Sequence, residues 1–507
     1  MYQKLKIISR SSRLAKIQSR LVGDELKKAY NGLKIEYYTT DAKADLDQSI
    51  NLAASGQVGL FTKDITRKII DEDFDIAVHS WKDIPIHPSD QTIIAGTLSR
   101  GDMRDVLILK NEILKDKKKS LEILTSSPRR KFNLNEVLPE LIPVSCEKII
   151  FKDIRGNIET RLKKFNEGNS QGIILAKVAI DRLIESDETD VQKSIKKIIK
   201  NNKWIILPLS IFPTAPGQAA IGIEIKKDRK KLFNFLNKIN NAKDYNSVIE
   251  EKKIMSQYGG GCHQKIGVSV WDKYDKKILS LTGETEQGIK LKKLSFIEDK
   301  HFKKQNIQPS KNLYPVGDND DPLFKRTLIH NQSQIEKIEK SFIYLSRKNV
   351  LDNCGQIQNS NLIWTSGLSC WKSAVKKGLW VSGTSDSFGE KDPILLDNFL
   401  SAKINFFKLS HSGASSNMFD LIPTYELKSN SHMISPIDLS AKTHFFWMSP
   451  TQFDQALKIC PAIINKNHSC GLGNTYQYLK IMLPSGKKIT PFLSYKDWLD
   501  FNLKEIQ

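Results

Sequence analysis

One thiol in the chain follows three consecutive glycines, within residues 258–263 (YGGGCH). Glycine reaches backbone conformations closed to other residues, so such a loop can bring the Cys262 thiol close to a bound partner. A free cysteine is more often a small buried apolar side chain, and this stretch alone leaves both interpretations open. Cys262 is therefore a candidate for covalent attachment, and the residues upstream must decide what it would hold.

A second candidate group closes an apolar strand, where residues 74–78 (FDIAV) run into residues 79–85 (HSWKDIP). In α/β sheets, ligands bind at the carboxyl ends of strands, so Lys82 and Asp83 are placed to meet one. A fixed carboxylate there can exchange a proton or stabilise a developing positive charge. An exposed strand end with ordinary surface charges is the alternative.

Arginine-bearing turns recur along the first part of the chain, each after a short apolar strand. Residues 6–20 combine a strand, a hydroxyl-rich turn and the start of a helix, where free N–H groups and the helix dipole favour an anion. Residues 124–130 and 153–162 repeat this order, and a helix carrying Arg182 follows a fourth strand. Guanidinium groups pair with planar carboxylates through two hydrogen bonds, so these turns predict a cleft for an acidic ligand.

Length and composition place these candidates in a multidomain globular protein. The chain has 507 residues, of which 39% are hydrophobic and 27% charged, and its apolar runs are shorter than the roughly 20 residues that span a bilayer. The opening residues also lack the apolar segment of a signal peptide, so we expect a cytoplasmic protein with no membrane partner. The six cysteines are scattered without a CxxC pair, which predicts neither a disulfide scaffold nor a metal site.

The formal net charge of +21 raises nucleic acid as an alternative partner. However, much of the lysine lies in helical runs such as residues 193–200, where a solvated helix face is the simpler explanation. Nucleic-acid binding would also leave Asp83 and the Cys262 loop unexplained. We therefore expect a monomer that acts on a small molecule, without nucleic acid.

In this order and at these separations, the motifs closely resemble those of the porphobilinogen deaminase family, also called hydroxymethylbilane synthases. The resemblance covers about residues 4–295 and rests on the HSWKDIP motif, the turn at residues 125–130, the segment from Arg155 to Arg161, and the Gly-Gly-Cys loop. It implies an α/β fold with two doubly wound domains like those of periplasmic binding proteins, and a small α+β domain that carries the cysteine. The expected domains are residues 1–100 with 200–224, residues 101–199, residues 225–300, a linker at residues 301–325, and an extra α/β domain at residues 326–507.

The resemblance also implies an activity. Family members join four porphobilinogen molecules, with loss of ammonia, on a covalently held dipyrromethane primer in tetrapyrrole and heme biosynthesis. It gives Cys262 the thioether to this cofactor and gives Asp83 the catalytic role. Each pyrrole carries an acetate and a propionate, which explains the many cations, since uncompensated buried charge is costly. Matching positions assign cofactor binding to Lys82, Thr125, Ser126, Ser127, Arg129, Arg130 and Arg155, and substrate binding to Arg10, Ser12, Arg161 and Arg182.

Three positions depart from the family's pattern. Arg13 stands where a proline is usual, Val58 where a lysine is expected, and Ala219 where a glycine follows Gln218. These departures concern loop contacts, since Asp83 and Cys262 are retained. A solute-binding protein of the same two-lobed fold is the remaining alternative.

The residues after the linker lie outside that resemblance. Residues 341–345, 361–365, 378–381 and 444–448 are expected to be strands of an α/β domain. Two of these strands end in hydroxyl-bearing turns, and the pattern resembles uroporphyrinogen-III synthase, although the tail is short for a complete copy. That resemblance implies cyclisation of the linear product to uroporphyrinogen III, and a non-catalytic appendage is the alternative.

Overall fold

The computed structural model describes residues 2–41, 62–86, 88–114, 120–259, 264–297, 308–316, 323–401, 403–415, 418–430 and 436–503. The chain forms two compact units. The first comprises Met1–Pro139, Val144–Ile297 and Leu396–Phe399, and the second comprises Glu140–Pro143, Glu298–Leu395 and Leu400–Gln507. Each unit is described by itself.

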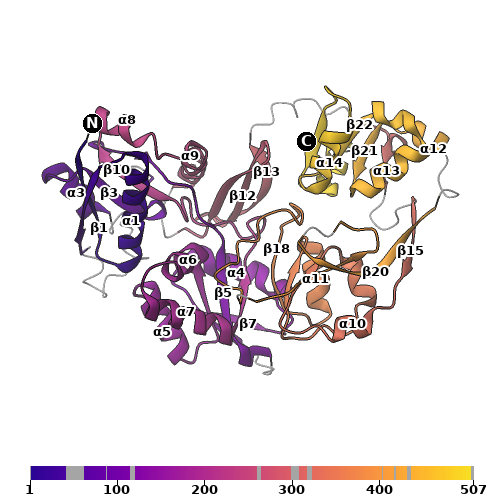
Figure 1. Cartoon of the computed structure of the whole chain (residues 1–507), viewed down its shortest axis with the longest axis horizontal. Helices are drawn as coiled ribbons and strands as arrows, with labels where there is room; N and C mark the ends of the chain where they lie inside the picture. The colour runs from indigo at the N-terminus through magenta and orange to yellow at the C-terminus, as the bar shows by residue number, and fades with distance from the viewer. Residues whose placement is uncertain are drawn as a thin grey trace. The chain divides into compact units, whose positions relative to one another are not determined.

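The first sheet of unit 1 has five strands in the order β2-β1-β3-β10-β4 (Figure 1). β1 pairs in parallel with β2 and β3, whereas β10 runs antiparallel to both β3 and β4. The central strands are apolar on both faces, which is typical of a sheet covered on both sides. The elements are β1 (Lys4–Arg10), α1 (Arg13–Ala29), β2 (Lys34–Thr40), α3 (Lys63–Asp71), β3 (Ile76–Ser80), the 3-10 helix η1 (Trp81–Asp83), β4 (Thr92–Gly96), β10 (Ile221–Lys226) and α8 (Lys230–Leu236).

The second sheet of unit 1 repeats this topology in the order β7-β6-β8-β5-β9. β6 is parallel to β7 and β8, and β5 is the antiparallel strand between β8 and β9. The chain therefore crosses between the sheets twice, and the expectation of two doubly wound domains is confirmed. The elements are β5 (Asp105–Lys110), η2 (Asn111–Leu114), β6 (Ser120–Leu124), α4 (Pro128–Leu141), β7 (Lys148–Lys152), α5 (Ile158–Glu167), β8 (Gly172–Ala176), α6 (Lys177–Ile184), α7 (Thr189–Asn201) and β9 (Asn202–Ile206).

A helix and a three-stranded antiparallel sheet complete unit 1, as the predicted α+β domain requires. α9 (Ala242–Ser256) packs on β11 (Gly267–Lys273), which pairs with β12 (Lys276–Glu284). The edge strand β13 (Lys290–Ile297), which the sequence does not predict, pairs with β12 along its own full length. β13 is rich in exposed lysine, which protects a free sheet edge but hides the apolar alternation of a strand.

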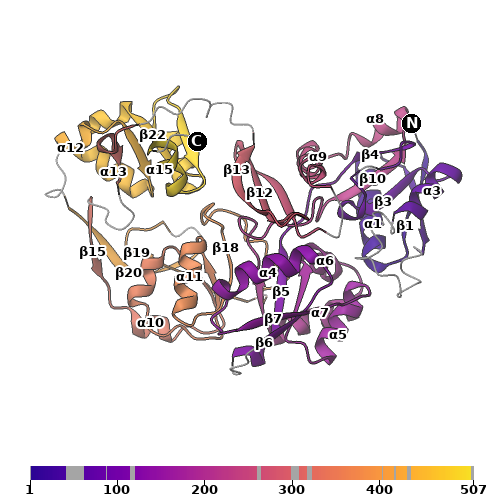
Figure 2. The same ribbon diagram turned by 180° about the vertical axis from the view of Figure 1, so that it is seen from behind.

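Unit 2 contains two α/β sheets, which confirms the additional α/β region (Figure 2). The larger has the order β15-β20-β19-β16-β17-β18, with β15 alone antiparallel, and the smaller is the parallel sheet β14-β21-β22-β23. The elements of the larger sheet are β15 (Phe324–Leu328), α10 (Gln332–Glu336), β16 (Phe342–Leu345), η5 (Lys348–Asn353), β17 (Leu362–Thr365), α11 (Leu368–Lys376), β18 (Val381–Thr384), β19 (Phe406–His411) and β20 (Asp420–Ser429). Those of the smaller are η4 (Ser310–Asn312), β14 (Leu313–Tyr314), α12 (Pro436–Ser440), β21 (His444–Trp447), α13 (Pro450–Ile459), η6 (Pro461–Asn465), β22 (Asn467–Gly471), α14 (Asn474–Met482), β23 (Ile489–Phe492) and α15 (Tyr495–Leu503).

Two segments of unit 2 differ from the pattern expected from sequence. The strand expected at residues 378–381 begins only at Val381, because Gly378 has a φ of +79° and its N–H bonds the carbonyl of Val375, closing the end of α11. Within the expected linker, β14 pairs with β21 through Leu313↔His444 and Tyr314↔Phe445. Part of that segment therefore belongs to the smaller sheet.

Candidate functional site

The HSWKDIP motif lies at the carboxyl end of β3 and continues into η1. Trp81 is buried and its N–H bonds the carbonyl of Ala220 at 3.0 Å, which fixes the turn against the chain entering β10. Gly217 packs beneath this turn with a φ of +77°, and a Cβ there would lie 3.1 Å from the backbone nitrogen of Lys82. Lys82 and Asp83 are only partly buried, so the turn presents both side chains while its backbone is held.

A buried polar network supports the strand that leads to this turn. His79 Nε2 lies 2.9 Å from Glu224 Oε2, and the hydroxyls of Thr92 and Thr66 donate to the same carboxylate at 2.6 and 3.0 Å. Burial raises the pKa of Glu224, but His79 and the two hydroxyls outweigh it and hold this pKa below its ordinary value. The network ties β3 to β10 and so fixes where η1 begins.

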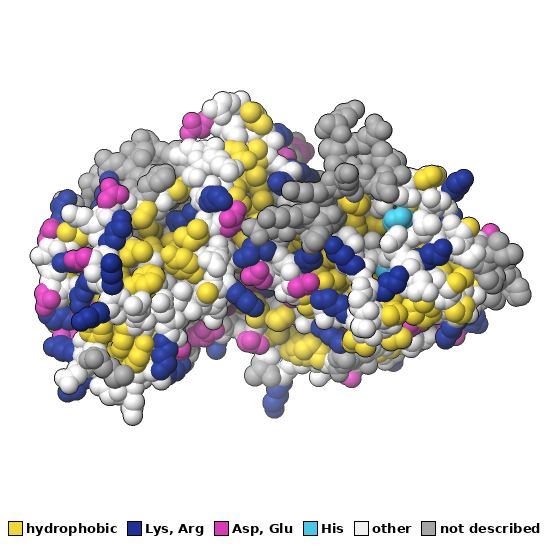
Figure 3. All heavy atoms as spheres, turned by 90° about the horizontal axis from the view of Figure 1, so that it is seen from above, with side chains coloured by type: hydrophobic (Ala, Val, Ile, Leu, Met, Phe, Trp, Pro, Cys, Tyr) yellow, Lys and Arg dark blue, Asp and Glu magenta, His cyan; other side chains and the backbone are white. Residues whose placement is uncertain are grey.

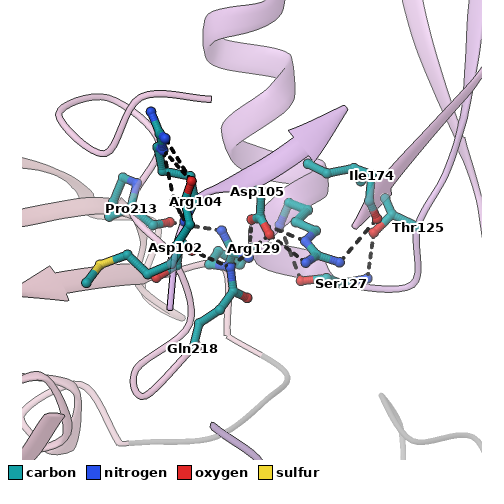
Figure 4. Close-up of polar contacts among 12 residues, drawn as sticks. Asp102, Arg104, Asp105, Thr125, Ser127, Arg129, Ile174, Pro213 and Gln218 are labelled. Atoms are coloured by element: carbon teal, nitrogen blue, oxygen red, sulfur yellow. Dashed lines mark hydrogen bonds and ion pairs between the residues drawn. The ribbon is translucent and has the colours of Figure 1, made fainter. Parts of the chain in front are cut away.

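The two consecutive arginines at the start of α4 are held by a buried carboxylate (Figure 4). Arg129 Nη2 and Arg130 Nη2 donate to Asp105 at 2.8 and 2.6 Å, and Gln218 Nε2 donates to it at 3.0 Å. Burial alone would raise the pKa of Asp105, but the two guanidiniums hold it well below its usual range. Asp105 was not predicted from the sequence, although a lone acidic residue opening the apolar strand β5 signals a buried charge that needs cationic partners.

The hydroxyl turn before α4 is organised by its own side chains. Thr125 Oγ1 accepts from the N–H of Ser127 at 3.2 Å, and Ser127 Oγ accepts from the N–H of Arg130 at 3.4 Å. Ser126 Oγ donates to the carbonyl of Ile154 at 2.9 Å, which ties this turn to the loop that carries Arg155. The predicted cofactor-binding hydroxyls and Arg155 therefore lie on two connected turns of the second sheet.

The predicted cations converge on Asp83. The pKa of Arg161 is lowered to about 10, by burial first and then by Arg130 and Arg10, against the opposing effect of Asp83. The pKa of Lys82 is lowered by burial and by Arg130 and Arg129, and Asp83 and Asp105 oppose this. Positive charge thus exceeds negative charge around Asp83, and a bound anion would relieve the excess. The cluster brings together Lys82, Asp83, Arg10, Arg129, Arg130 and Arg161.

Two predicted substrate-binding residues have structural partners instead. Ser12 caps α1, where its hydroxyl accepts from the N–H of Ala15 at 3.4 Å. Arg182 is buried, which lowers its pKa to about 10, and its Nη2 donates to the carbonyl of Ala219 at 2.8 Å. Their contact with substrate stays a prediction.

The structure describes the elements on either side of the cysteine loop. Cys262 and the departure at Val58 lie outside the described residues. α9 precedes the loop, and its Glu251 receives two hydrogen bonds from Arg100, at 2.8 and 3.0 Å, and one from the N–H of Gly217 at 2.7 Å. The helix leading to Cys262 is thereby bonded to the turn that packs beneath Lys82.

The described part of the chain contains no group of three or more His, Cys, Asp or Glu side chains that could hold a metal ion. Its helices include none long and apolar enough to cross a membrane. On the face shown in Figure 3, Lys and Arg side chains are interspersed with Asp and Glu instead of forming one basic patch.

Comparison with known proteins finds the same family over the first part of the chain. The family described as "Porphobilinogen deaminase, dipyromethane cofactor binding domain" matches residues 5–234. The probable porphobilinogen deaminase of Picrophilus torridus is 38% identical over 264 residues, which cover 52% of this chain and 84% of that protein. The porphobilinogen deaminase of Caldicellulosiruptor saccharolyticus is 33% identical over 299 residues, which cover 59% of this chain and 94% of that protein. Among solved structures, a putative periplasmic sulfonate-binding protein of Methylobacillus flagellatus matches with a TM-score of 0.26 and 14% identity, over 49% of this chain and 68% of that one.

Proposed function

The chain belongs to the porphobilinogen deaminase family, and from that premise we propose that it is a hydroxymethylbilane synthase, a transferase of tetrapyrrole biosynthesis. It joins four porphobilinogen molecules, with loss of ammonia, on a dipyrromethane cofactor. The observation that carries this proposal is the position of Asp83, a carboxylate at a strand end surrounded by Lys82, Arg130 and Arg161. A solute-binding protein would need the cations to bind an acidic ligand, but it would not need a carboxylate among them.

The residues present fit a dipyrromethane. Its two pyrroles carry four carboxylates. The pKa values of Lys82 and Arg161 are lowered by burial and by neighbouring arginines, so these cations gain from an anionic partner. When bound, the cofactor supplies the primer from which the chain of pyrroles grows. Cys262 is the proposed attachment point. The residues proposed to hold the cofactor's carboxylates are Lys82, Arg129, Arg130 and Arg155, with Thr125, Ser126 and Ser127 supplying hydroxyl and backbone donors.

Asp83 is the proposed catalytic residue. Loss of ammonia from porphobilinogen leaves a cationic, azafulvene-like pyrrole, and a fixed carboxylate beside the pyrrole N–H stabilises that charge and exchanges its proton. Arg161 interacts electrostatically with both Asp83 and Arg10, and Arg10 and Arg161 are proposed to bind the carboxylates of the incoming substrate. Ser12 and Arg182 are proposed to support that binding from α1 and α6.

Intact-mass measurement tests the attachment. The purified chain should be heavier than its sequence by two porphobilinogen units less two ammonias, and Cys262→Ser should remove this increment together with activity. Cys146→Ser is the matched control, because Cys146 is a partly exposed thiol remote in sequence from the glycine loop, and it should keep both. An unmodified but fully active protein would contradict the proposal.

A second proposed function concerns unit 2. The hydroxyl-bearing turns that follow β17 and β21 lead into α11 and α13, whose first N–H groups can donate hydrogen bonds to carboxylates. Ser449 caps α13, whereas Gly367 begins α11 without a side-chain cap. Arg347, just after β16, donates from Nη2 to the carbonyl of Met448 at 3.0 Å, so the strand ends of both sheets of unit 2 meet. We propose that this region cyclises the linear product to uroporphyrinogen III.

The uroporphyrin isomer that forms from porphobilinogen tests this second function. Porphobilinogen is supplied to the full chain and to a chain ending near residue 310, before β14, and the uroporphyrins are separated after oxidation. The proposal expects the type III isomer from the full chain and type I from the shorter one. Type I from both would leave unit 2 as a non-catalytic appendage.

The assembly state and compartment also stay predictions. We propose a cytoplasmic monomer whose partner is porphobilinogen, without nucleic acid or membrane. Light scattering on the eluting full chain tests the oligomeric state.

A further inference from the structure

The carboxyl ends of β16 and β19 and the middle of the neighbouring strand β20 place polar side chains side by side in the larger sheet of unit 2. β16, β19 and β20 are parallel, with Leu345 opposite Leu409 and His411 opposite Tyr425. Arg347 follows β16 by two residues, so it continues this row beside His411. Ligands of α/β sheets bind at such carboxyl ends, which makes this edge a candidate site independent of the deaminase cluster.

Arg326 reaches the same place from β15. Its guanidinium lies over the ring of Tyr425, with 5.3 Å between the guanidinium carbon and the ring centroid. The side-chain amide of Asn349, oriented with its oxygen toward the guanidinium, accepts from Arg326 Nη1 at 2.9 Å. Ring and amide thus hold the guanidinium in one place while the side chain stays exposed.

Both arginines act on the ring of Tyr425, and Arg347 also acts on His411. Burial raises the pKa of Tyr425, and Arg347 and Arg326 both oppose that rise. Burial lowers the pKa of His411, and Arg347 and Lys408 lower it further, which favours the neutral form of this imidazole. The two guanidiniums therefore lie around the Tyr425–His411 pair, whose ring centroids are 6.0 Å apart.

Neither arginine has a carboxylate within ion-pair distance among the described residues, whereas neighbouring Lys408 is paired with Glu390. Arg347 uses one N–H on the carbonyl of Met448 and Arg326 uses its amide contact, so each guanidinium keeps further donors for a ligand. Two guanidinium groups that are held in place and lack a carboxylate partner match a molecule with two planar anionic groups.

We propose that Arg326 and Arg347 form a binding site in unit 2 for a small molecule that carries two or more carboxylates. Each guanidinium would take one carboxylate, and the neutral His411 ring between them would offer a further hydrogen bond. The choice of a polycarboxylate over other anions rests on the second proposed function, in which the ligand is the linear tetrapyrrole made by unit 1. The site itself rests on the two arginines.

Hydrogen exchange on the full chain tests the site locally, because a ligand bound at the deaminase cluster of unit 1 would protect other peptides. The probe is benzene-1,3,5-tricarboxylate, and the readout is protection of peptides covering residues 409–414 and 424–428. Arg326→Gln and Arg347→Gln should each weaken the apparent affinity measured at these peptides about tenfold, since each variant loses the charge-assisted hydrogen bonds of one guanidinium to a carboxylate. Deaminase activity should be unchanged in both variants, which shows that the chain is folded.

Lys325→Gln is the matched control. Lys325 precedes Arg326 on β15 and therefore points to the other face of the sheet, while its loss removes the same charge. This variant should keep the protection. An equal loss in Lys325→Gln, protection that survives both arginine substitutions, or equal protection by inorganic phosphate would overturn the proposal.

The isomer assay separates this inference from the cyclisation proposal. If the tricarboxylate protects these peptides but the full chain yields only type I uroporphyrin, the site stands and cyclisation fails. If type III forms equally in the wild type and in the Arg326→Gln, Arg347→Gln double variant, cyclisation stands and the site fails.

Discussion

Asp83 combines a partly buried carboxylate with a rigid backbone, because η1 is fixed by Trp81 and by the Gly217 turn. Replacing it by Asn keeps the shape and removes the charge. We predict that Asp83→Asn retains the covalent cofactor mass and lowers turnover at least about a hundredfold, as for other losses of fixed electrostatic stabilisation. Steady-state kinetics and intact mass on the same sample check this. Asp73→Asn, an exposed carboxylate paired with Lys6, is the control and should turn over normally.

Asp105 should matter for stability over a definite pH range. Its pKa in the folded chain lies below the roughly 3.9 of an unfolded aspartate, so its contribution is complete above about pH 5 and is lost as pH falls toward the folded pKa. Asp105→Asn leaves two buried guanidiniums without their carboxylate and should cost about 3–5 kcal/mol near neutral pH. Urea unfolding should show this gap at pH 7 and a narrower one at pH 3. Asp153→Asn, at an exposed pair with Lys131, should change little.

Ala219 carries strain that a glycine would not. Its φ is +71° although it is not glycine, and its carbonyl accepts from buried Arg182. Left-handed backbone costs a residue with a Cβ about 1–2 kcal/mol, so Ala219→Gly should raise the free energy of unfolding by about 1 kcal/mol. Ala220→Gly, at the next buried position, has no such strain to relieve and should be destabilising. Chemical denaturation of both variants decides the point.

The sequence indicates the side chains of the candidate site, but it does not indicate the buried residues that hold them in place. Lys82, Asp83 and the arginines are recognisable because their types and spacing have a chemical purpose. Asp105, Glu224 and Glu251 were missed, since each meets its partners only after distant segments come together. A lone acidic residue within an apolar element was the available signal.

The two doubly wound domains of unit 1 are joined across their helices by Arg13. This residue begins α1, and it pairs with Glu159 of α5 at 3.0 Å and with Glu188, which precedes α7, at 2.7 Å. An arginine in place of the usual proline therefore adds a link between the domains. These groups are partly exposed, so each pair contributes only about 0.2–1 kcal/mol.

We predict that Arg13→Ala destabilises the chain by about 1 kcal/mol in dilute buffer and by less at about 1 M salt, where exposed charges are screened. Arg20→Ala is the control, since Arg20 is exposed on the same helix and has no ion pair among the described residues. A loss that does not depend on salt would point to packing of the Arg13 side chain instead of its charge.

Strands with apolar alternation or a chemical motif at their end were predictable, and β1, β6, β8 and β17 lie where the sequence placed them. β3 was also predicted, but it begins at Ile76 and extends to Ser80 instead of ending at Val78. β13, β15 and β20 were not predicted, because exposed lysine, arginine and threonine fill their outward positions. The pairing partners were also unpredictable, because β10 joins β3 and β4 from more than a hundred residues away. Local pattern specifies a strand but not its neighbours.

Two compact units imply two unfolding events. We predict two transitions in calorimetry of the full chain. Glu251→Gln breaks the buried pair with Arg100 and should lower one transition by several degrees while leaving the other in place. Lys428→Gln, at an exposed pair with Glu426 in unit 2, should move neither. A single transition shifted as a whole by Glu251→Gln would show that the units unfold together.

The exchange of strands in unit 1 also sets an order of assembly during synthesis. The second sheet is continuous in the chain from β5 to β9, so all its strands have left the ribosome once residue 206 has emerged. The first sheet, although begun earlier, lacks its antiparallel strand until residues 221–226 follow. The nascent chain must therefore keep an incomplete amino-terminal sheet, with β3 and β4 unjoined, while the later domain closes. A chaperone that binds exposed strand edges would meet this protein first at β3 and β4.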